Sequence, residues 1–144
     1  MPRIQIELAP RYAFSTEVQV YISHVNQGGH LDNAQLLSLV SEARTRFFRA
    51  QGYLEGNVEG CHIVVGDMVA QYKSEAFYGE TLRVSMQPAD FNRYGFDLQF
   101  VMVEVSTGRE VARGKTGIVF IGTGPAPAKV TPIPPAFLAK LQAM

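Results

Sequence analysis

The feature that most restricts the fold of this chain is a single long helical pattern between Asn33 and Ala50. Its apolar residues recur at helical spacing, and Leu37 and Phe48 widen the apolar surface beyond one stripe. A helix that is apolar over so much of its circumference has to be mostly buried. The main stripe consists of Leu36, Leu39, Val40, Ala43 and Phe47. We therefore expect a fold in which the other elements pack around this helix.

The segments on either side of the helix have the two-residue alternation that is typical of β-strands. The pattern predicts one strand before the helix and four strands after it, over residues 14–22, 61–73, 80–90, 94–105 and 111–121. Short turns between successive strands favour an antiparallel meander, and Gly66 marks a possible β-bulge. One long central helix on a five-stranded, mainly antiparallel sheet is an α+β architecture.

The division into domains follows from the same patterns. Residues 1–121 are expected to form a single domain, because 144 residues with 47% hydrophobic content suit one core. Residues 122–144 form a Pro-rich tail that ends in a short helical stretch, "AFLAKLQAM". The edge strands of such a sheet need a partner, which favours a homodimer or a dimer of dimers.

Composition excludes several classes of function. The 13 basic and 13 acidic residues balance without forming a basic stripe, which argues against nucleic-acid binding. No apolar run is long enough to span a membrane, and "MPRIQIELAP" lacks the features of a signal peptide. Cys61 is the only cysteine, so a cytoplasmic location is expected. His24 and His30 lie six residues apart across a glycine loop, which is not a zinc-ligand spacing, and no metal is expected.

The polar loop before the helix is the strongest candidate for a functional site. In "DNAQ", Asp32 is placed to cap the helix, with Gln35 three residues later. Other N–H groups at the helix start remain available at the positive end of the helix dipole, and Gly28 and Gly29 allow close approach of a ligand. Such N–H donors could form an oxyanion hole. The alternative is an ordinary cap after an ordinary glycine loop.

Three sequence blocks resemble hot-dog-fold acyl-CoA thioesterases of the 4-hydroxybenzoyl-CoA thioesterase type. The first is "HVNQGGHLDNAQLLSLVSEARTRFF", in which the matching positions are Asn26, Gly29, His30, Leu31, Asn33, Glu42 to Arg44, Phe47 and Phe48. The second is "YKSEAFYGETLRV" and the third is "REVARGKTGIVFI". The resemblance covers roughly residues 14–121 and implies the hot-dog fold.

The resemblance also implies an activity, the hydrolysis of an acyl thioester to a free acid and coenzyme A, with no cofactor apart from the coenzyme A of the substrate. Gly29 and the N–H near Asn33 would be the oxyanion donors. Many relatives have a catalytic Asp where this chain has Asn26, and an amide cannot act as a nucleophile or a general base at neutral pH. Asn26 could still orient a water molecule or the substrate carbonyl.

Three residues are candidates for the acid–base chemistry. Glu42 lies on the apolar helix, where desolvation would make it a useful base, although an ion pair with Arg46 is the alternative. Asp32 is the second carboxylate, with helix capping as its alternative role. His30 could contact the thioester or could only hold the loop together.

Lys73 could bind a phosphate of coenzyme A, and Tyr78 could line an acyl tunnel. The alternatives are a surface salt bridge and a place in the core. The sequence is also compatible with two other functions. One is a hydratase or dehydratase of the same fold acting on acyl-CoA or acyl carrier protein, with His30 and Glu42 as its pair. The other is a non-catalytic acyl-CoA-binding protein.

Overall fold

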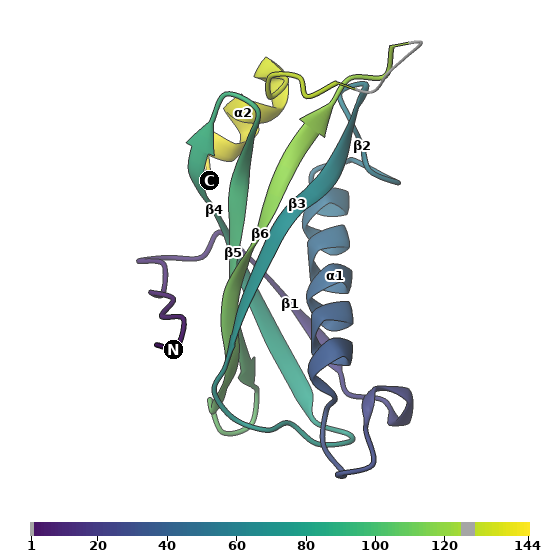
Figure 1. Cartoon of the computed structure of the whole chain (residues 1–144), viewed down its shortest axis with the longest axis vertical. Coiled ribbons are helices and arrows are strands. Elements are labelled where there is room, and N and C mark those ends of the chain that lie inside the picture. The colour runs from purple at the N-terminus through teal and green to yellow at the C-terminus, as the bar shows by residue number, and fades with distance from the viewer. Residues whose placement is uncertain (1, 125–128) are drawn as a thin grey trace.

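One long helix lies along one face of a curled sheet in the computed structural model, which describes residues 2–124 and 129–144 (Figure 1). The elements in chain order are β1 (Phe14–Gln19), the short 3₁₀ helix η1 (Ile22–His24), α1 (Asn33–Ala50), β2 (Asn57–Val58), β3 (Cys61–Tyr72), β4 (Thr81–Asn92), β5 (Gly95–Glu104), β6 (Glu110–Ile121) and α2 (Pro135–Gln142). This is the predicted α+β arrangement, and α1 has the predicted bounds.

The sheet is antiparallel throughout, with the strand order β1-β4-β5-β6-β3-β2. β4, β5 and β6 form the predicted meander, but the prediction that β3 continues it is wrong, because β3 pairs with β6 and not with β4. The segment that joins β3 to β4 crosses the end of the sheet, and there Leu31 N–H donates a hydrogen bond of 2.7 Å to Ala76 O. β2 is a sixth strand, and its two residues are too few to show an alternating pattern.

Two local features of the strands follow from the sequence. Strand pairing shifts register between Val65 and Asp67, which confirms the predicted bulge at Gly66. β1 ends at Gln19, before the predicted end at residue 22, because Tyr21 N–H donates to His24 Nδ1 at 3.0 Å and the chain turns into η1.

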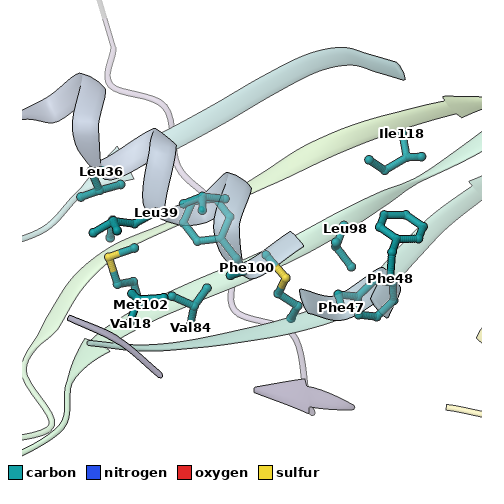
Figure 2. Packing of buried hydrophobic residues seen from close by; sticks show 14 of the residues in the cluster. Val18, Leu36, Leu39, Phe47, Phe48, Val84, Leu98, Phe100, Met102 and Ile118 are labelled. Carbon is teal, nitrogen blue, oxygen red and sulfur yellow. The ribbon is translucent and has the colours of Figure 1, made fainter. Parts of the chain in front are cut away.

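The core lies between α1 and the sheet, as Figure 2 shows for labelled members of the cluster. All residues of the predicted stripe are at most 5% exposed, and Phe48 is also buried. They pack against the inner face of the central strands, which supplies Val84, Leu98, Phe100, Met102 and Ile118. Burying each of these side chains contributes about 1.5–3 kcal/mol to folding.

The end of the tail also belongs to this core. α2 lies where the sequence predicts a short helix, and its Phe137 is fully buried. The Phe137 ring lies 5.4 Å from the Tyr53 ring and 5.8 Å from the Phe48 ring, measured between centroids. Residues 125–128 of the predicted Pro-rich tail lie outside the described residues. α2 therefore closes the core at the C-terminal end of α1 and leaves the N-terminal end of α1 accessible.

Candidate functional site

A cavity of about 340 Å³ lies at the N-terminal end of α1. It is lined by Asn26, His30, Leu31, Asn33, Leu36, Tyr72, Lys73, Ser74, Glu75, Ala76 and Val111. The lining comes from the glycine loop, the first turns of α1, the segment after β3 and the start of β6. Figure 1 shows the loop and the β3–β4 connection at the same end of the molecule. The cavity has an apolar floor and several converging polar groups, as small-molecule sites do.

The start of α1 leaves one of its N–H groups available to a ligand. The first four N–H groups of a helix need acceptors from outside its own ladder. Asp32 Oδ2 accepts from Ala34 N–H at 3.0 Å and from Gln35 N–H at 3.3 Å, and Asp32 N–H donates to His24 O. Among the described residues, Asn33 N–H has no acceptor. Asn33 lines the cavity, so this donor lies at the positive end of the helix dipole beside it.

Asn26 and His30 lie together in a tight turn, in which Asn26 N–H donates to His30 O at 3.0 Å and Gly28 packs against both side chains. Gly28 N–H donates to Asn26 Oδ1 at 2.9 Å, which leaves the Asn26 amide NH₂ to act as a donor. A Cβ on Gly28 would lie 3.2 Å from Asn26 Oδ1 and 3.3 Å from His30 Nε2, so a larger residue would displace these side chains by a few tenths of an ångström.

His30 faces a carboxylate that lies far away in the sequence. Its Nδ1 donates to Leu31 O at 3.2 Å, which leaves Nε2 as the acceptor of a neutral ring. Nε2 lies 3.6 Å from Glu75 Oε1. This distance is too long for a direct hydrogen bond, but one water molecule could donate to both atoms.

Tyr72 fixes the first residue of α1. Its hydroxyl donates to Asn33 O at 3.0 Å. Partial burial raises the pKa of Tyr72, and the nearby Asp32 carboxylate raises it further. The hydroxyl therefore remains protonated at neutral pH and holds the Asn33 peptide in position.

The predicted site residues separate into two groups. Asn26, His30, Asn33 and Lys73 all line the cavity, and Asp32 caps the helix beside it. Glu42, Gly29 and Tyr78 are not among the residues that line this cavity.

Glu42 lines a separate cavity of about 290 Å³ that also contains His24. Its carboxylate forms an ion pair of 2.8 Å with Arg46, the alternative that helical spacing allowed. Gly29 N–H donates to Asn26 O at 3.0 Å, so its own backbone holds the turn. Tyr78 is 65% exposed on the turn before β4.

Sequence reasoning did not identify Glu75. It lies within a block that resembles the family, but no spacing or periodicity distinguishes it from the neighbouring polar residues. Its position depends on the crossover from β3 to β4, where the predicted meander was wrong. A correct strand order would have placed the segment 73–80 beside the start of α1.

The described residues contain neither a metal-ligand group nor a membrane-spanning helix. Residues 2–124 and 129–144 contain no group of three or more His, Cys, Asp or Glu side chains that could hold a metal ion. No helix in those same ranges is both long enough and apolar enough to cross a membrane.

The fold and the cavity together define a hot-dog protein with a polar site at the start of its central helix. A 1,4-dihydroxy-2-naphthoyl-CoA thioesterase from Synechocystis is 18% identical, covering 91% of this chain and 96% of that chain, with a TM-score of 0.77. A 4-hydroxybenzoyl-CoA thioesterase from a Pseudomonas species is 12% identical over 90% and 99%, with a TM-score of 0.79. A thioesterase from Thermus thermophilus, complexed with coenzyme A and zinc, is 22% identical over 92% and 99%, with a TM-score of 0.76.

These identities are low enough that the structural likeness establishes the fold alone. The sequence itself supplies the family, since residues 20–141 match the family model of the Thioesterase-like superfamily. The chain belongs to the Thioesterase-like superfamily, as its loop and helix motifs predicted. None of the curated proteins matches the sequence significantly.

Proposed function

We propose that the protein hydrolyses an acyl-CoA thioester to a free acid and coenzyme A. The observation that carries this proposal is the free Asn33 N–H, which shares its cavity with the Asn26 amide and the His30–Glu75 pair. Membership of the Thioesterase-like superfamily supports the same reaction class.

In this proposal the thioester oxygen accepts hydrogen bonds from Asn33 N–H and from the Asn26 amide NH₂. Both donors are fixed before the substrate arrives, one by the helix cap and Tyr72, the other by Gly28. Donors that need no reorganisation stabilise the oxyanion of the tetrahedral intermediate, and removing one such donor typically lowers kcat by about 10²–10³-fold.

The attacking water donates its hydrogens to His30 Nε2 and Glu75 Oε1. As the water oxygen bonds to the thioester carbon, its proton moves to His30 Nε2, and the Glu75 carboxylate stabilises the imidazolium. Collapse of the intermediate breaks the carbon–sulfur bond. The leaving thiolate takes the proton back from His30, which gives the acid, the free thiol and the original enzyme.

The test is thiol release by the purified protein from a panel of aliphatic and aromatic acyl-CoAs.

General-base catalysis contributes about 10²–10⁴-fold, so His30→Gln should lower kcat by a factor in that range, and Glu75→Gln should lower it by a smaller factor. Glu42→Gln is the matched carboxylate variant from the neighbouring cavity and should retain activity. A large loss in Glu42→Gln with normal activity in Glu75→Gln would reverse the assignment. A folded wild-type protein that is inactive on the whole panel would contradict the function.

A second candidate function is the hydration or dehydration of acyl thioesters, because that chemistry uses a histidine with an acid and His30 lies beside Glu75. Glu42, which the sequence offered as the acid, lines a different cavity from His30. Reversible water addition to enoyl thioesters, without release of thiol, would favour this candidate over hydrolysis.

We also propose that the active unit is a homodimer that forms through β3. β2 covers only Cys61 and His62 of this 12-residue strand, and Ile63 N–H donates to Gly56 O. From Val64 to Tyr72 the outer edge of β3 has no strand partner among the described residues. A long exposed edge with apolar side chains favours pairing with another strand.

A further inference from the structure

Another cavity, of about 360 Å³, lies toward the C-terminal end of α1, away from the proposed thioester site. It is lined by Arg44, Thr45, Phe48, Arg49, Tyr53, Glu55, Gly56, Val58, Ile63, Val64, Val65 and Ile118. Most of these side chains are apolar, and the volume lies in the range of about 300–1,000 Å³ that is usual for small-molecule sites. The proposed hydrolysis makes no use of this cavity.

Arg44 is the unusual member of the lining. It is partly buried on α1, and burial lowers the pKa of its guanidinium. Within the described ranges its guanidinium makes one hydrogen bond, to Ser41 Oγ at 3.3 Å. Among the described residues it has no carboxylate partner, whereas Arg46, two positions further along, has Glu42. A cation in an apolar cavity is costly unless an anion compensates it, so Arg44 is placed to receive an anion from a ligand.

We call the cavity of about 360 Å³ the Arg44 cavity. Pairing of two copies through the free edge of β3 would bring the Arg44 cavity of one copy close to the cavity at the start of α1 in the other. The unpartnered segment runs from Val64 to Tyr72, and an antiparallel pair of identical segments places the start of one beside the end of the other. Val64 and Val65 line the Arg44 cavity, and Tyr72 lines the cavity at the start of α1. Both cavities lie on the α1 side of the sheet, and a two-fold axis perpendicular to the sheet keeps them on that side. In such a pair, the Arg44 cavity of one copy would border the proposed thioester site of the other.

We propose that the Arg44 cavity of one copy receives the far end of the acyl group bound to the other copy, and that Arg44 selects acyl groups that end in a carboxylate. This inference rests on the proposed function and names its substrate class. The apolar walls hold the body of the acyl chain, and the guanidinium forms charge-assisted hydrogen bonds with the terminal carboxylate. Arg49 and Glu55 line the same cavity, but both side chains are exposed, so water solvates their charges when they have no partner.

The test compares matched acyl-CoAs that differ only in a terminal carboxylate, namely hexanoyl with hexanedioyl, decanoyl with decanedioyl and benzoyl with 4-carboxybenzoyl. In at least one pair, the wild-type protein should show a kcat/KM about 10- to 100-fold higher for the carboxylated member, as expected for a hydrogen bond to a charged group. Arg44→Met should abolish this preference and leave the uncharged member nearly unchanged. Arg44→Lys should restore part of it, which shows that charge and not folding is responsible. Arg93→Met is the matched control, because Arg93 is exposed beside Tyr94, and it should keep the full preference.

Three results would overturn the inference. An equal loss for both members in Arg44→Met would mean that Arg44 binds the phosphates of coenzyme A or supports the fold. Dissociation of the dimer in Arg44→Met would mean that Arg44 pairs with a carboxylate of the second copy. If the wild-type protein is equally active on both members of all three pairs, it does not recognise a terminal carboxylate.

Binding separates failure of this inference from failure of the proposed function. If no acyl-CoA is hydrolysed, calorimetry with the same intact pairs still decides the matter. Tighter binding of a carboxylated member, lost in Arg44→Met, would support the Arg44 site even without hydrolysis, whereas equal binding within every pair would overturn it.

Discussion

At the scale of single residues, the candidate site depends on hydrogen bonds that fix each donor in one direction. Asn26 Oδ1 is held by Gly28 N–H, so the amide offers its NH₂ side to a ligand. His30 Nδ1 is held by Leu31 O, so Nε2 is the nitrogen that can accept a proton. Asn26, where many relatives have a catalytic Asp, is therefore suited to bind the substrate oxygen and not to attack the thioester.

Gly28 provides a test of this arrangement. In Gly28→Ala the added Cβ would press on Asn26 Oδ1 and His30 Nε2, so kcat should fall by about 10- to 100-fold because the reacting groups are displaced. The melting temperature should change little, since the loop is exposed. Gly124→Ala is the control, because no described residue has an atom within 4 Å of a Cβ at that position. Unchanged kinetics in Gly28→Ala would show that the loop adapts and that its geometry is not required.

How far the site could be predicted from sequence depended on the range of the interactions. Asn26, His30 and Asn33 were predicted to act together, and they do line one cavity because they lie within eight residues on one loop. Glu42 illustrates the opposite case, since helical spacing allowed both a catalytic base and an ion pair with Arg46, and only coordinates could show the pair. Glu75 required knowledge of the strand order.

At the scale of elements, α1 was predicted with its bounds because its capping residue and its apolar stripe are local signals. The strand order was predicted only in part. The β4–β5–β6 meander is joined by short turns that the sequence reveals. β3 instead pairs with β6 through contacts between residues at least 40 positions apart, as for Val69 and Lys115. No local pattern reports such a pairing.

The turn between β5 and β6 depends on a buried carboxylate, Glu104. It accepts hydrogen bonds from the backbone and the hydroxyl of both Ser106 and Thr107, at 2.6–3.1 Å. The hydrogen bonds from Ser106 are the main cause that lowers its pKa from 4.5 to about 2.

Because folding lowers this pKa, the stabilising effect of Glu104 is present in full above about pH 4.5 and is lost as the pH falls toward 2. Glu104→Gln should therefore lower the melting temperature at pH 7 by roughly 5 °C, and the difference from wild type should shrink at pH 3. Thermal unfolding of both proteins between pH 7 and pH 2.5 measures it. A difference that stays constant over this range would show that the carboxylate charge has no part in the stability of the turn.

Thr116 on β6 is a polar residue whose replacement should stabilise the fold, in contrast to Glu104. It is 1% exposed, and its hydroxyl has no hydrogen-bond partner within the described ranges. Valine has nearly the same shape without the hydroxyl, so Thr116→Val should raise the melting temperature by about 3 °C. Thr107→Val, which removes a bonded hydroxyl, should lower it. A decrease in Thr116→Val would mean that the hydroxyl has a partner in solution.

At the scale of the whole molecule, the two cavities and the free edge of β3 point to an assembly. α2 closes the core at one end of α1, and α1 covers one face of the sheet. Within residues 2–124 and 129–144, no strand pairs with the outer edge of β3 from Val64 to Tyr72. The sequence predicted an edge in need of a partner from the number of strands alone. β1 is the edge strand on the other side of the sheet, and the long edge of β3 is open because of the position of β3, which the strand pattern could not supply.

Charging the open edge of β3 tests whether the assembly is required for activity. Val65 is 45% exposed in the single chain, so Val65→Glu should cost the monomer little. In a β3-paired dimer the same change would bury a carboxylate, so we expect monomers by analytical ultracentrifugation. Thioesterase activity should fall with the dimer, because each proposed acyl site uses both copies. Val65 also lines the Arg44 cavity, so Val65→Thr, which changes the same wall without adding a charge, should keep both the dimer and the activity. Val130→Glu is the matched control, since Val130 is 52% exposed and lies away from this edge, beside Ile121.

If Val65→Glu is monomeric and fully active, the site is complete in one chain and the β3 dimer plays no part in catalysis. If it stays dimeric, and the double variant Val65→Glu/Arg44→Met, which removes the nearby cation, is also dimeric, the copies pair through another surface.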